Sequence, residues 1–208
     1  MLQIIVTAMG IGLVFNATPG AVFTESLRRG VRGGFRPAFA VQVGSLTGDA
    51  VWAILGLSGV AALFLLPGVR IPVTVAGCLI LAGLGVQGLR DALIGEPTKA
   101  SAEASGGRSS AMLAGAGMSL GNPWNIVYWA GAAGAVAGTL GEQPDSRHLV
   151  AFFLGFMFSS LSWCFVCAGL IAGLRRALTH RAVRAVEAVT GAALLVFAGL
   201  MLVRSVTE

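Results

Sequence analysis

The sequence predicts an all-α integral membrane protein with six transmembrane helices in a single domain covering residues 1–208. Composition is the first reason: 56% of the residues are hydrophobic and only 11% are charged, whereas about 25% are charged in an ordinary soluble domain. The second reason is length, because six apolar runs can each cross about 30 Å of hydrocarbon. The third is the content of 30 glycines, which membrane helices use so that their backbones can approach one another.

Short polar or basic connections separate the six predicted helices. The predicted spans cover residues 2–27, 38–66, 71–94, 111–139, 149–174 and 182–203. The third connection, residues 95–110, is rich in Ser, Ala and Gly and is typical of a flexible linker. It separates a first group of three helices, within residues 1–94, from a second group within residues 111–208.

Lys and Arg are distributed unequally between the two sides of the predicted bundle. Three of the fourteen, Arg70, Arg147 and Arg204, lie on one side. The other eleven lie in the first, third and fifth connections: Arg28, Arg29, Arg32, Arg36, Arg90, Lys99, Arg108, Arg175, Arg176, Arg181 and Arg184. Because basic loops stay in the cytoplasm, we expect both termini outside the cell membrane and the linker inside. Since topology accounts for the net charge of +5, we expect no nucleic-acid partner.

Two of the predicted helices are interrupted by proline beside asparagine. The first helix contains NATPGAVF, residues 16–23, and the fourth contains SLGNPWNIVYW, residues 119–129. Pro19 and Pro123 occupy matching places in the two groups of three. Because the first group has an odd number of helices, it ends on the opposite side of the membrane from where it began. The second group therefore starts from that opposite side, which predicts two inverted repeats. Paired interruptions of this kind indicate the binding site of a transporter, although ordinary kinks are the alternative interpretation.

The interruptions expose polar groups that suit a zwitterion. Proline has no N–H, so the carbonyls of Phe15 and Ser119 lose their helical partners and can accept from an ammonium group. Gly20 leaves room for a ligand, and the amides after it begin a half-helix that suits a carboxylate. The substrate-binding candidates are Asn16, Thr18, Pro19, Gly20, Asp49, Asn122, Pro123, Asn125 and Tyr128, the last with packing as an equal alternative.

Asp49 lies deeper in an apolar run than any other acidic residue of the chain. A carboxylate at membrane depth is costly, and this makes it a functional hypothesis by default. Gln42, Ser45, Asp49 and Trp52 recur at helical spacing and predict one polar stripe that faces the interior. Three roles remain open for Asp49: exchange of a proton, contact with a substrate amine, or a structural bond to a neighbouring helix.

Several other motifs have structural interpretations. Cys164 and Cys167 form C-x-x-C inside an apolar span, which favours packing over redox or metal chemistry. We expect no cofactor and no metal. Glu25 is expected to form a solvated pair with Arg28 or Arg29. Internal helix packing is expected for the G-x-x-x-G pairs Gly134/Gly138 and Gly169/Gly173, and the sequence leaves open whether the chain forms a homo-oligomer.

Taken in order, these motifs resemble the LysE/RhtB family of amino-acid exporters over nearly the whole chain. RRGVRGGF, residues 28–35, resembles the basic turn of the family, and GSLTGD, residues 44–49, resembles its G-x-x-x-G followed by a polar or acidic residue. The T-P-G-P motif of the family is matched by Thr18, Pro19 and Gly20, with Ala21 replacing the second proline. Its N-P-K-A motif is matched by Asn122 and Pro123, with Trp124 replacing lysine.

The resemblance implies a secondary active exporter of amino acids or related small metabolites, driven by proton antiport through alternating access. The implied partners are a small zwitterionic substrate, protons and the lipid bilayer. A passive channel of the same fold is the alternative. A membrane-embedded enzyme is disfavoured because His148 and His180, the two histidines, lie in connections and no nucleophile–base set is present.

Overall fold

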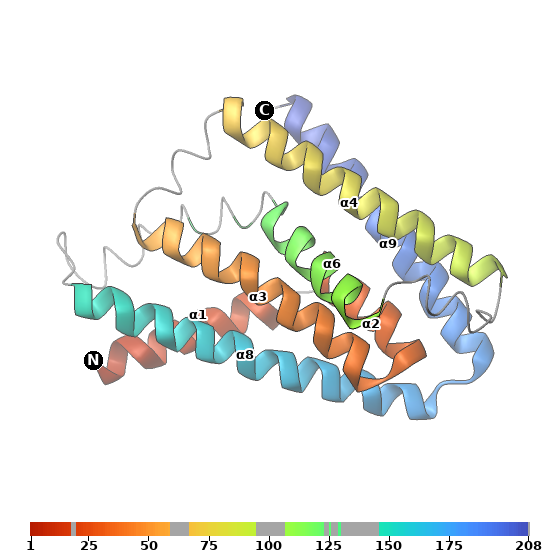
Figure 1. Cartoon of the computed structure of the whole chain (residues 1–208), viewed down its shortest axis with the longest axis horizontal. Helices are drawn as coiled ribbons and strands as arrows, with labels where there is room; N and C mark the ends of the chain where they lie inside the picture. The colour runs from red at the N-terminus through yellow and green to blue at the C-terminus, as the bar shows by residue number, and fades with distance from the viewer. Residues whose placement is uncertain are drawn as a thin grey trace.

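The computed structural model describes residues 1–17, 20–58, 67–94, 107–122, 125, 129 and 146–207, and these residues form seven α-helices without a strand (Figure 1). All six predicted spans contain helix, so the all-α prediction is confirmed. The helices are α1 (Leu2–Ala17), α2 (Ala21–Gly33), α3 (Phe35–Leu57), α4 (Pro67–Ile94), α6 (Arg108–Leu120), α8 (Ser146–Ala177) and α9 (His180–Thr207).

Three of these helices are long and apolar enough to cross a membrane by themselves. They are α3, α8 and the segment Arg181–Leu200 of α9. The pair α1 and α2 also qualifies as one span, bent by 64° at the break between them. The shorter apolar segment Cys78–Arg90 lies within α4. The described residues therefore carry three or four spans by this measure, and the full six-span arrangement remains a prediction.

Both predicted interruptions coincide with helix ends. In the first, α1 ends at Ala17 and α2 begins at Ala21, with Gly20 between them in an extended conformation (φ −154°, ψ −166°). In the second, α6 ends at Leu120, before the second asparagine–proline pair. Thr18, Pro19, Pro123, Trp124 and Tyr128 lie outside the described residues.

Several connections are shorter than the sequence predicts. The basic segment 28–36 is almost wholly helical, and Gly34 alone separates α2 from α3. Its positive φ of 80° favours glycine, and its N–H donates to the Gly30 carbonyl at 2.7 Å. Likewise α4 begins at Pro67, because proline is tolerated in the first turn of a helix. The helix α6 begins at Arg108, inside the predicted linker.

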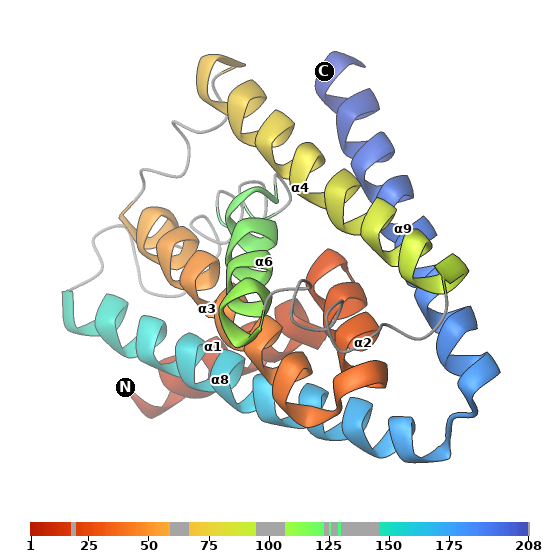
Figure 2. The same cartoon turned by 45° about the vertical axis from the view of Figure 1, so that its right-hand side comes forward.

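The helices pack mainly in three pairs, of which α4–α9 is antiparallel while α3–α6 and α1–α8 are parallel. In Figures 1 and 2, α4 lies along α9, α3 lies along α6, and α1 lies along α8. The helix α3 also packs on α8, and the short helix α2 contacts α3, α8 and α9. The N-terminus lies beside the start of α8, so α1 and α8 begin at the same end of the bundle (Figure 1).

Two helix pairs meet through glycine. Along α3, a Cβ on Gly44 would overlap the carbonyl of Met112, and one on Gly115 of α6 would overlap the carbonyl of Val41. Between α4 and α9, a Cβ on Gly88 would lie 3.0 Å from the Cα of Gly191. The backbones approach this closely because at least one partner in each contact is glycine, and between α4 and α9 both partners are.

The glycine pair Gly169/Gly173 contradicts the expectation of internal packing. A Cβ on either residue would meet nothing within 4 Å, since both lie on the exposed face of α8. The pair Gly134/Gly138 lies outside the described residues. A G-x-x-x-G spacing therefore marks a close contact in α3, where Gly44 and Gly48 face α6, and an open surface in α8.

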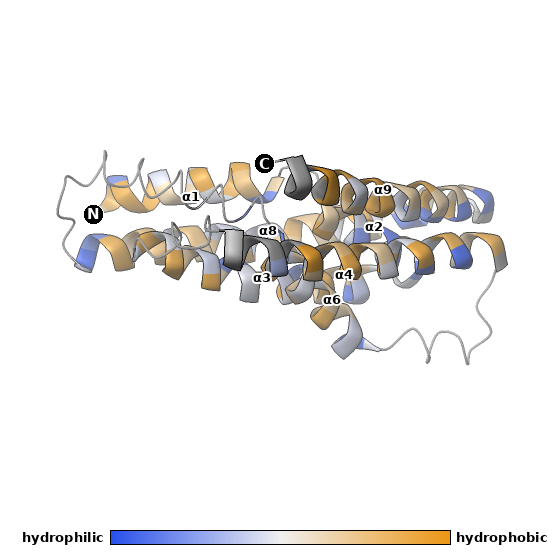
Figure 3. Cartoon of the chain, turned by 90° about the horizontal axis from the view of Figure 1, so that it is seen from above, coloured by the Kyte–Doolittle hydropathy of each residue, from blue (hydrophilic) through white to orange (hydrophobic). Residues whose placement is uncertain are grey.

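Apolar residues make up most of the helices (Figure 3). Large exposed hydrophobic residues occur on most of the helices, including Leu2, Leu79, Leu113, Leu154, Leu170 and Val189. Patches of this extent are rare on soluble monomers. The surface is that expected of helices surrounded by lipid.

The close contact of α3 with α6 generates a first prediction. Gly115→Ala should lower the Tm of the detergent-purified protein, because the new methyl group overlaps the Val41 carbonyl, and overpacking costs about 1–3 kcal/mol. Gly173→Ala is the matched control and should leave the Tm unchanged or slightly raised, since the site is open and alanine favours helix. An equal loss of Tm in both variants would contradict the packing described here.

Candidate functional site

The polar stripe of α3 faces the interior, as its spacing predicts. Gln42, Ser45, Asp49 and Trp52 are all buried, with Asp49 retaining 3% exposure. Gln42 donates one hydrogen bond to the Ser26 hydroxyl of α2 at 3.0 Å. The stripe thus meets α2 at one end and, as described below, α6 at the other.

Asp49 is a buried acidic side chain that meets no cation among the described residues. The hydroxyl of Ser119 donates to its Oδ1 at 3.0 Å, and this contact is possible because Gly48 leaves space for the Ser119 side chain. Among the described residues Asp49 makes no ion pair, and its second oxygen makes no hydrogen bond. A serine hydroxyl can donate to a carboxylate or accept from a carboxylic acid. The site can therefore hold Asp49 in either protonation state.

The second interruption is joined directly to Asp49 through Ser119. The side-chain amide of Asn125 donates to the Ser119 carbonyl at 2.9 Å and lies 3.3 Å from the Ser119 hydroxyl. Asn122 in turn donates to Oδ1 of Asn125 at 3.3 Å. Two of the predicted asparagines and Asp49 therefore form one network across α3 and the end of α6.

The carbonyl of Ser119 is not free for a substrate, contrary to the expectation from the sequence. Besides Asn125, the indole N–H of Trp52 donates to it at 3.2 Å. The proline four residues later has no N–H to offer, and two side-chain donors take its place. Two side-chain donors therefore occupy the Ser119 carbonyl at this interruption.

The first interruption has a separate polar contact. Asn16, near the end of α1, donates to the Gly12 carbonyl at 2.7 Å and to the Ser160 hydroxyl of α8 at 2.8 Å. The structure does not bond Asn16 to Asp49. The thiol of Cys164, one turn further along α8, donates to the Ser160 carbonyl at 3.2 Å. The helix α8 packs both on α1, which carries Asn16, and on α3, which carries Asp49.

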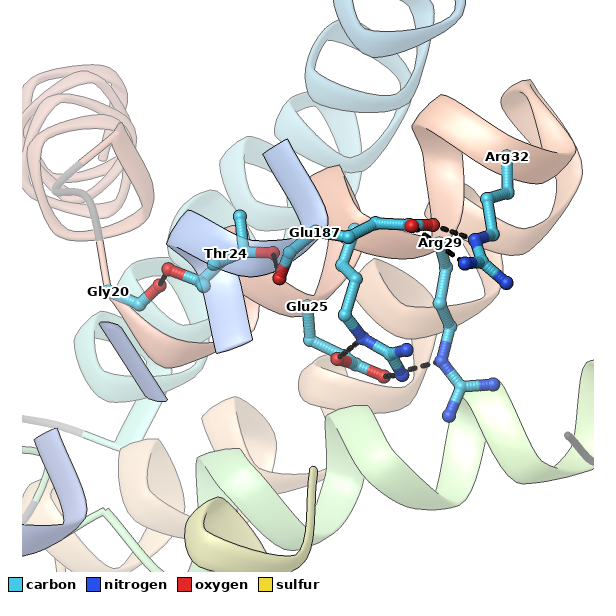
Figure 4. Close-up of polar contacts among 8 residues, drawn as sticks. Gly20, Thr24, Glu25, Arg29, Arg32 and Glu187 are labelled. Carbon is cyan, nitrogen blue, oxygen red and sulfur yellow. Dashed lines mark hydrogen bonds and ion pairs between the residues drawn. The ribbon is translucent and has the colours of Figure 1, made fainter. Parts of the chain in front are cut away.

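The first three amides of α2 have no hydrogen-bond partner among the described residues, and we refer to them below as the unpaired amides. The N–H of Thr24 and its hydroxyl both donate to the Gly20 carbonyl at 2.9 Å (Figure 4). The three preceding amides, at residues 21–23, make no hydrogen bond with a described residue, and Gly20 provides no side-chain cap. Amides at the start of a helix carry partial positive charge and suit an anionic group.

An aromatic cluster brings the two interruptions together. The ring of Phe156 in α8 lies 5.8 Å from the ring of Phe15, just before the first interruption. On another side it meets Trp129, just after the second interruption, edge-on at 4.8 Å. Trp52 belongs to the same buried cluster. The ends of the two interrupted segments therefore converge on one phenylalanine.

A second polar group lies on α2, and it differs from the expected solvated pair. Glu25 is fully buried and accepts from Arg28 through two nitrogens at 2.8 Å, and from Arg29 at 2.6 Å. The contact is buried because α3, α8 and α9 surround α2. Further along α2, Arg32 pairs with Glu187 of α9, which is also fully buried (Figure 4).

Sequence reasoning missed Glu187, Ser160 and the role of Ser119. Glu187 lies one turn after Arg184 in the last apolar run. An acidic residue within an apolar run is the same sequence signal that singled out Asp49. Serines give no comparable signal, because they commonly bond their own helix. Within the described ranges, no three His, Cys, Asp or Glu side chains are grouped as metal ligands would be. Cys164 and Cys167 are buried free thiols.

Comparison with known proteins gives one family match and two relatives. The family described as LysE type translocator matches residues 13–205. The chain is 50% identical to the chemotactic transduction protein ChpE of Pseudomonas aeruginosa, over 97% of this chain and 98% of that protein. It is 25% identical to the putative amino acid efflux protein YcgF of Bacillus subtilis, over 94% and 93% respectively. No solved structure matches the chain significantly.

The different partners of Asp49 and Glu25 generate a second prediction. Glu25→Gln should destabilise the protein by about 3–5 kcal/mol, because it leaves buried Arg28 without its carboxylate. Asp49→Asn should cost much less, since no cation loses a partner and the new amide oxygen still accepts from Ser119. Thermal melting of the two purified variants measures the difference. Equal destabilisation would show that Asp49 has a charged partner.

Proposed function

The chain belongs to the LysE type translocator family, and on that premise we propose that it is a secondary active exporter of amino acids or related small metabolites. In this proposal it resides in the cell membrane and exchanges its substrate for protons through alternating access. Family membership makes it a membrane transporter and not an enzyme. The observation that carries the finer proposal is buried Asp49, which meets no cation among the described residues and is bonded to the second interruption through Ser119.

Asp49 has the properties required of a proton-exchanging group. A permanently paired carboxylate would stay charged, whereas Asp49 has no ion-pair partner among the described residues. Its hydrogen bond to Ser119 can reverse direction when the acid gains a proton. An intramembrane acid of this kind is typical of a proton relay.

The surroundings support a zwitterionic substrate. The unpaired amides at the start of α2 suit a carboxylate. The second oxygen of Asp49 and the side chain of Asn122 suit an ammonium group. We assign Asn16, Thr18, Pro19, Gly20, Pro123, Asn125 and Tyr128 to the walls of the same site. The name of the relative YcgF, a putative amino acid efflux protein, agrees with this substrate class.

The packing supports two inverted repeats, residues 1–94 and 111–208, with the linker between them. If the helices of the two repeats are matched in chain order, α1 corresponds to α6, α3 to α8 and α4 to α9. Under this match, the contact of α1 with α8 corresponds to the contact of α6 with α3. The remaining large contacts, α4 with α9 and α3 with α8, each join a helix to its own counterpart. Such symmetry is what alternating access between two repeats requires.

A role in chemotactic transduction is a second candidate, favoured by the 50% identity to ChpE. The two functions can be separated with a variant that folds but does not transport. If the chain signals through its transport activity, Asp49→Asn should abolish both metabolite export and the chemotactic response of the host cell. If it signals by contact with another protein, the chemotactic response should persist in that variant.

The distribution of basic residues generates a third prediction, on topology. We expect the termini outside and residues 95–110 in the cytoplasm. A single cysteine at Glu103, introduced after Cys78, Cys164 and Cys167 are replaced, should react with an impermeant thiol reagent only after the cells are opened. Reaction in intact cells would place the linker outside and overturn the orientation.

The lack of an ion-pair partner for Asp49 among the described residues generates a fourth prediction. Asp49→Asn keeps the hydrogen bond to Ser119 but cannot release a proton, so uphill proton-driven export in proteoliposomes should disappear. Substrate counterflow should persist, because exchange of substrate for substrate does not require deprotonation. Ser45→Ala, one turn away on the same stripe, is the control and should retain both activities.

Other outcomes of this experiment assign other roles. Weaker substrate binding by about 2–5 kcal/mol in Asp49→Asn would indicate direct contact with a substrate cation. Wild-type uphill export at every pH would show that Asp49 is structural. Absence of accelerated exchange in the wild-type protein would identify a passive channel in place of a carrier.

A further inference from the structure

The helices α4 and α9 form a two-helix arm with its own tight interface. Besides the glycine contact described above, the Cys78 thiol of α4 donates to the Ala198 carbonyl of α9 at 3.4 Å. Near the other end of the arm, Arg184 of α9 donates to the Ala92 carbonyl of α4 at 3.0 Å. The contacts run between residues 78–92 of α4 and 184–198 of α9, and the two helices diverge toward the start of α4 in Figure 2. These contacts are suited to holding the pair together as one body.

The short helix α2 lies between this arm and the rest of the protein. On one side, Phe23 and Leu27 pack against a buried cluster of α3 and α8 that includes Ala38 and Ile171. On the other side, Ala21 and Val22 pack against a cluster containing Leu194 and Ala198 of the arm. The main contacts of the arm with other helices are those with α2 and α6. The arm therefore covers the start of α2, where the unpaired amides lie.

Among the described residues, an ion pair crosses this boundary. Arg32 of α2 pairs through Nε and a terminal nitrogen with Glu187 of α9, and the terminal nitrogen lies 2.6 Å from Oε2. Glu187 is completely buried, whereas the Arg32 side chain keeps 24% exposure. The pairs of Glu25 differ, because both partners lie on α2 and move with it.

The burial of Glu187 makes this contact suited to two discrete states. A buried carboxylate that loses its cation is strongly unfavourable unless water reaches it. If the arm moves away from α2, Glu187 and Arg32 must therefore both become hydrated. A partly open, dry arrangement is disfavoured, and the arm is either closed with the pair formed or open with both charges in water.

We propose that Arg32 and Glu187 form the latch of a cytoplasmic gate, in which the α4–α9 arm separates from α2 to uncover the substrate site. The proposal rests on the transport function proposed above and adds two positioning residues to it. The structure holds the latch closed. Release of the latch exposes the amides at the start of α2 to the cytoplasm, and its closure precedes release of substrate to the outside.

A reversible cross-link tests the proposal. Arg32→Cys and Glu187→Cys, introduced with Cys78, Cys164 and Cys167 replaced by alanine, should form a disulfide on oxidation. The oxidised protein should lose both export and counterflow, and a reductant should restore them. The matched control joins native Cys78 to Ala198→Cys within the arm and should remain active when oxidised. Equal transport by the oxidised and reduced latch variant, or inactivation of the oxidised control, would overturn the proposal.

A labelling experiment separates the latch from the transported substrate. In inside-out vesicles, a single cysteine at Val22 should react with a thiol reagent about tenfold faster when Glu187→Gln is added, which corresponds to a shift of about 1.4 kcal/mol. Arg184→Gln, a change within the arm, should leave the rate unchanged. If Glu187→Gln does not fold, Arg32→Gln/Glu187→Gln, which leaves no buried unpaired charge, serves instead.

The two readouts distinguish failure of the latch from failure of the exporter. Faster labelling of Val22 in a protein that exports no amino acid would support the latch and contradict the proposed substrate. An unchanged labelling rate in a folded variant would overturn the latch, whatever the protein transports.

Discussion

A helix surrounded by apolar side chains and lipid must satisfy its backbone hydrogen bonds within the protein, because water is not available to replace them. The second interruption illustrates this constraint. The carbonyl of Ser119 has a proline four residues later, so it cannot receive the usual helical N–H. Trp52 and Asn125 supply two side-chain donors instead. The positions of α3 and α6 relative to one another follow from this requirement, together with the glycines that let the helices approach.

The same constraint applies to charge. Buried Glu25 and Glu187 each have arginine partners, since an unpaired charge in a dry interior is costly. Asp49 is equally buried and has only the Ser119 hydroxyl among the described residues. That difference separates carboxylates that are paired with arginine from one that meets no cation among the described residues. It also explains why the proposed transport chemistry centres on Asp49 and the proposed gate on Glu187.

The arrangement of helices connects these two regions. The helix α2 begins beside the first interruption and ends at Gly33. At its start it carries amides without a partner among the described residues, and near its end it carries Arg32, the arginine of the proposed latch. A displacement of the α4–α9 arm from α2 therefore acts on the latch and on the covered amides together. Since α8 packs against both α1 and α3, the Asn16 contact and the Asp49 network remain on one common support.

The sequence alone determined the all-α class, the break in the first helix and the interior position of the Asp49 stripe. Those features follow from local chemistry: apolar run length, the missing N–H of proline, and the spacing of Gln42 and Asp49 along one helix face. Only the tertiary structure decided which partners these groups meet. The Glu25 pair is buried because other helices cover α2, and Gly169 and Gly173 face outward because no helix packs on them. Ser119 reaches Asp49, and Arg32 reaches Glu187, across contacts between residues distant in the chain. Local spacing contains no information on such contacts, since they depend on how whole helices pack.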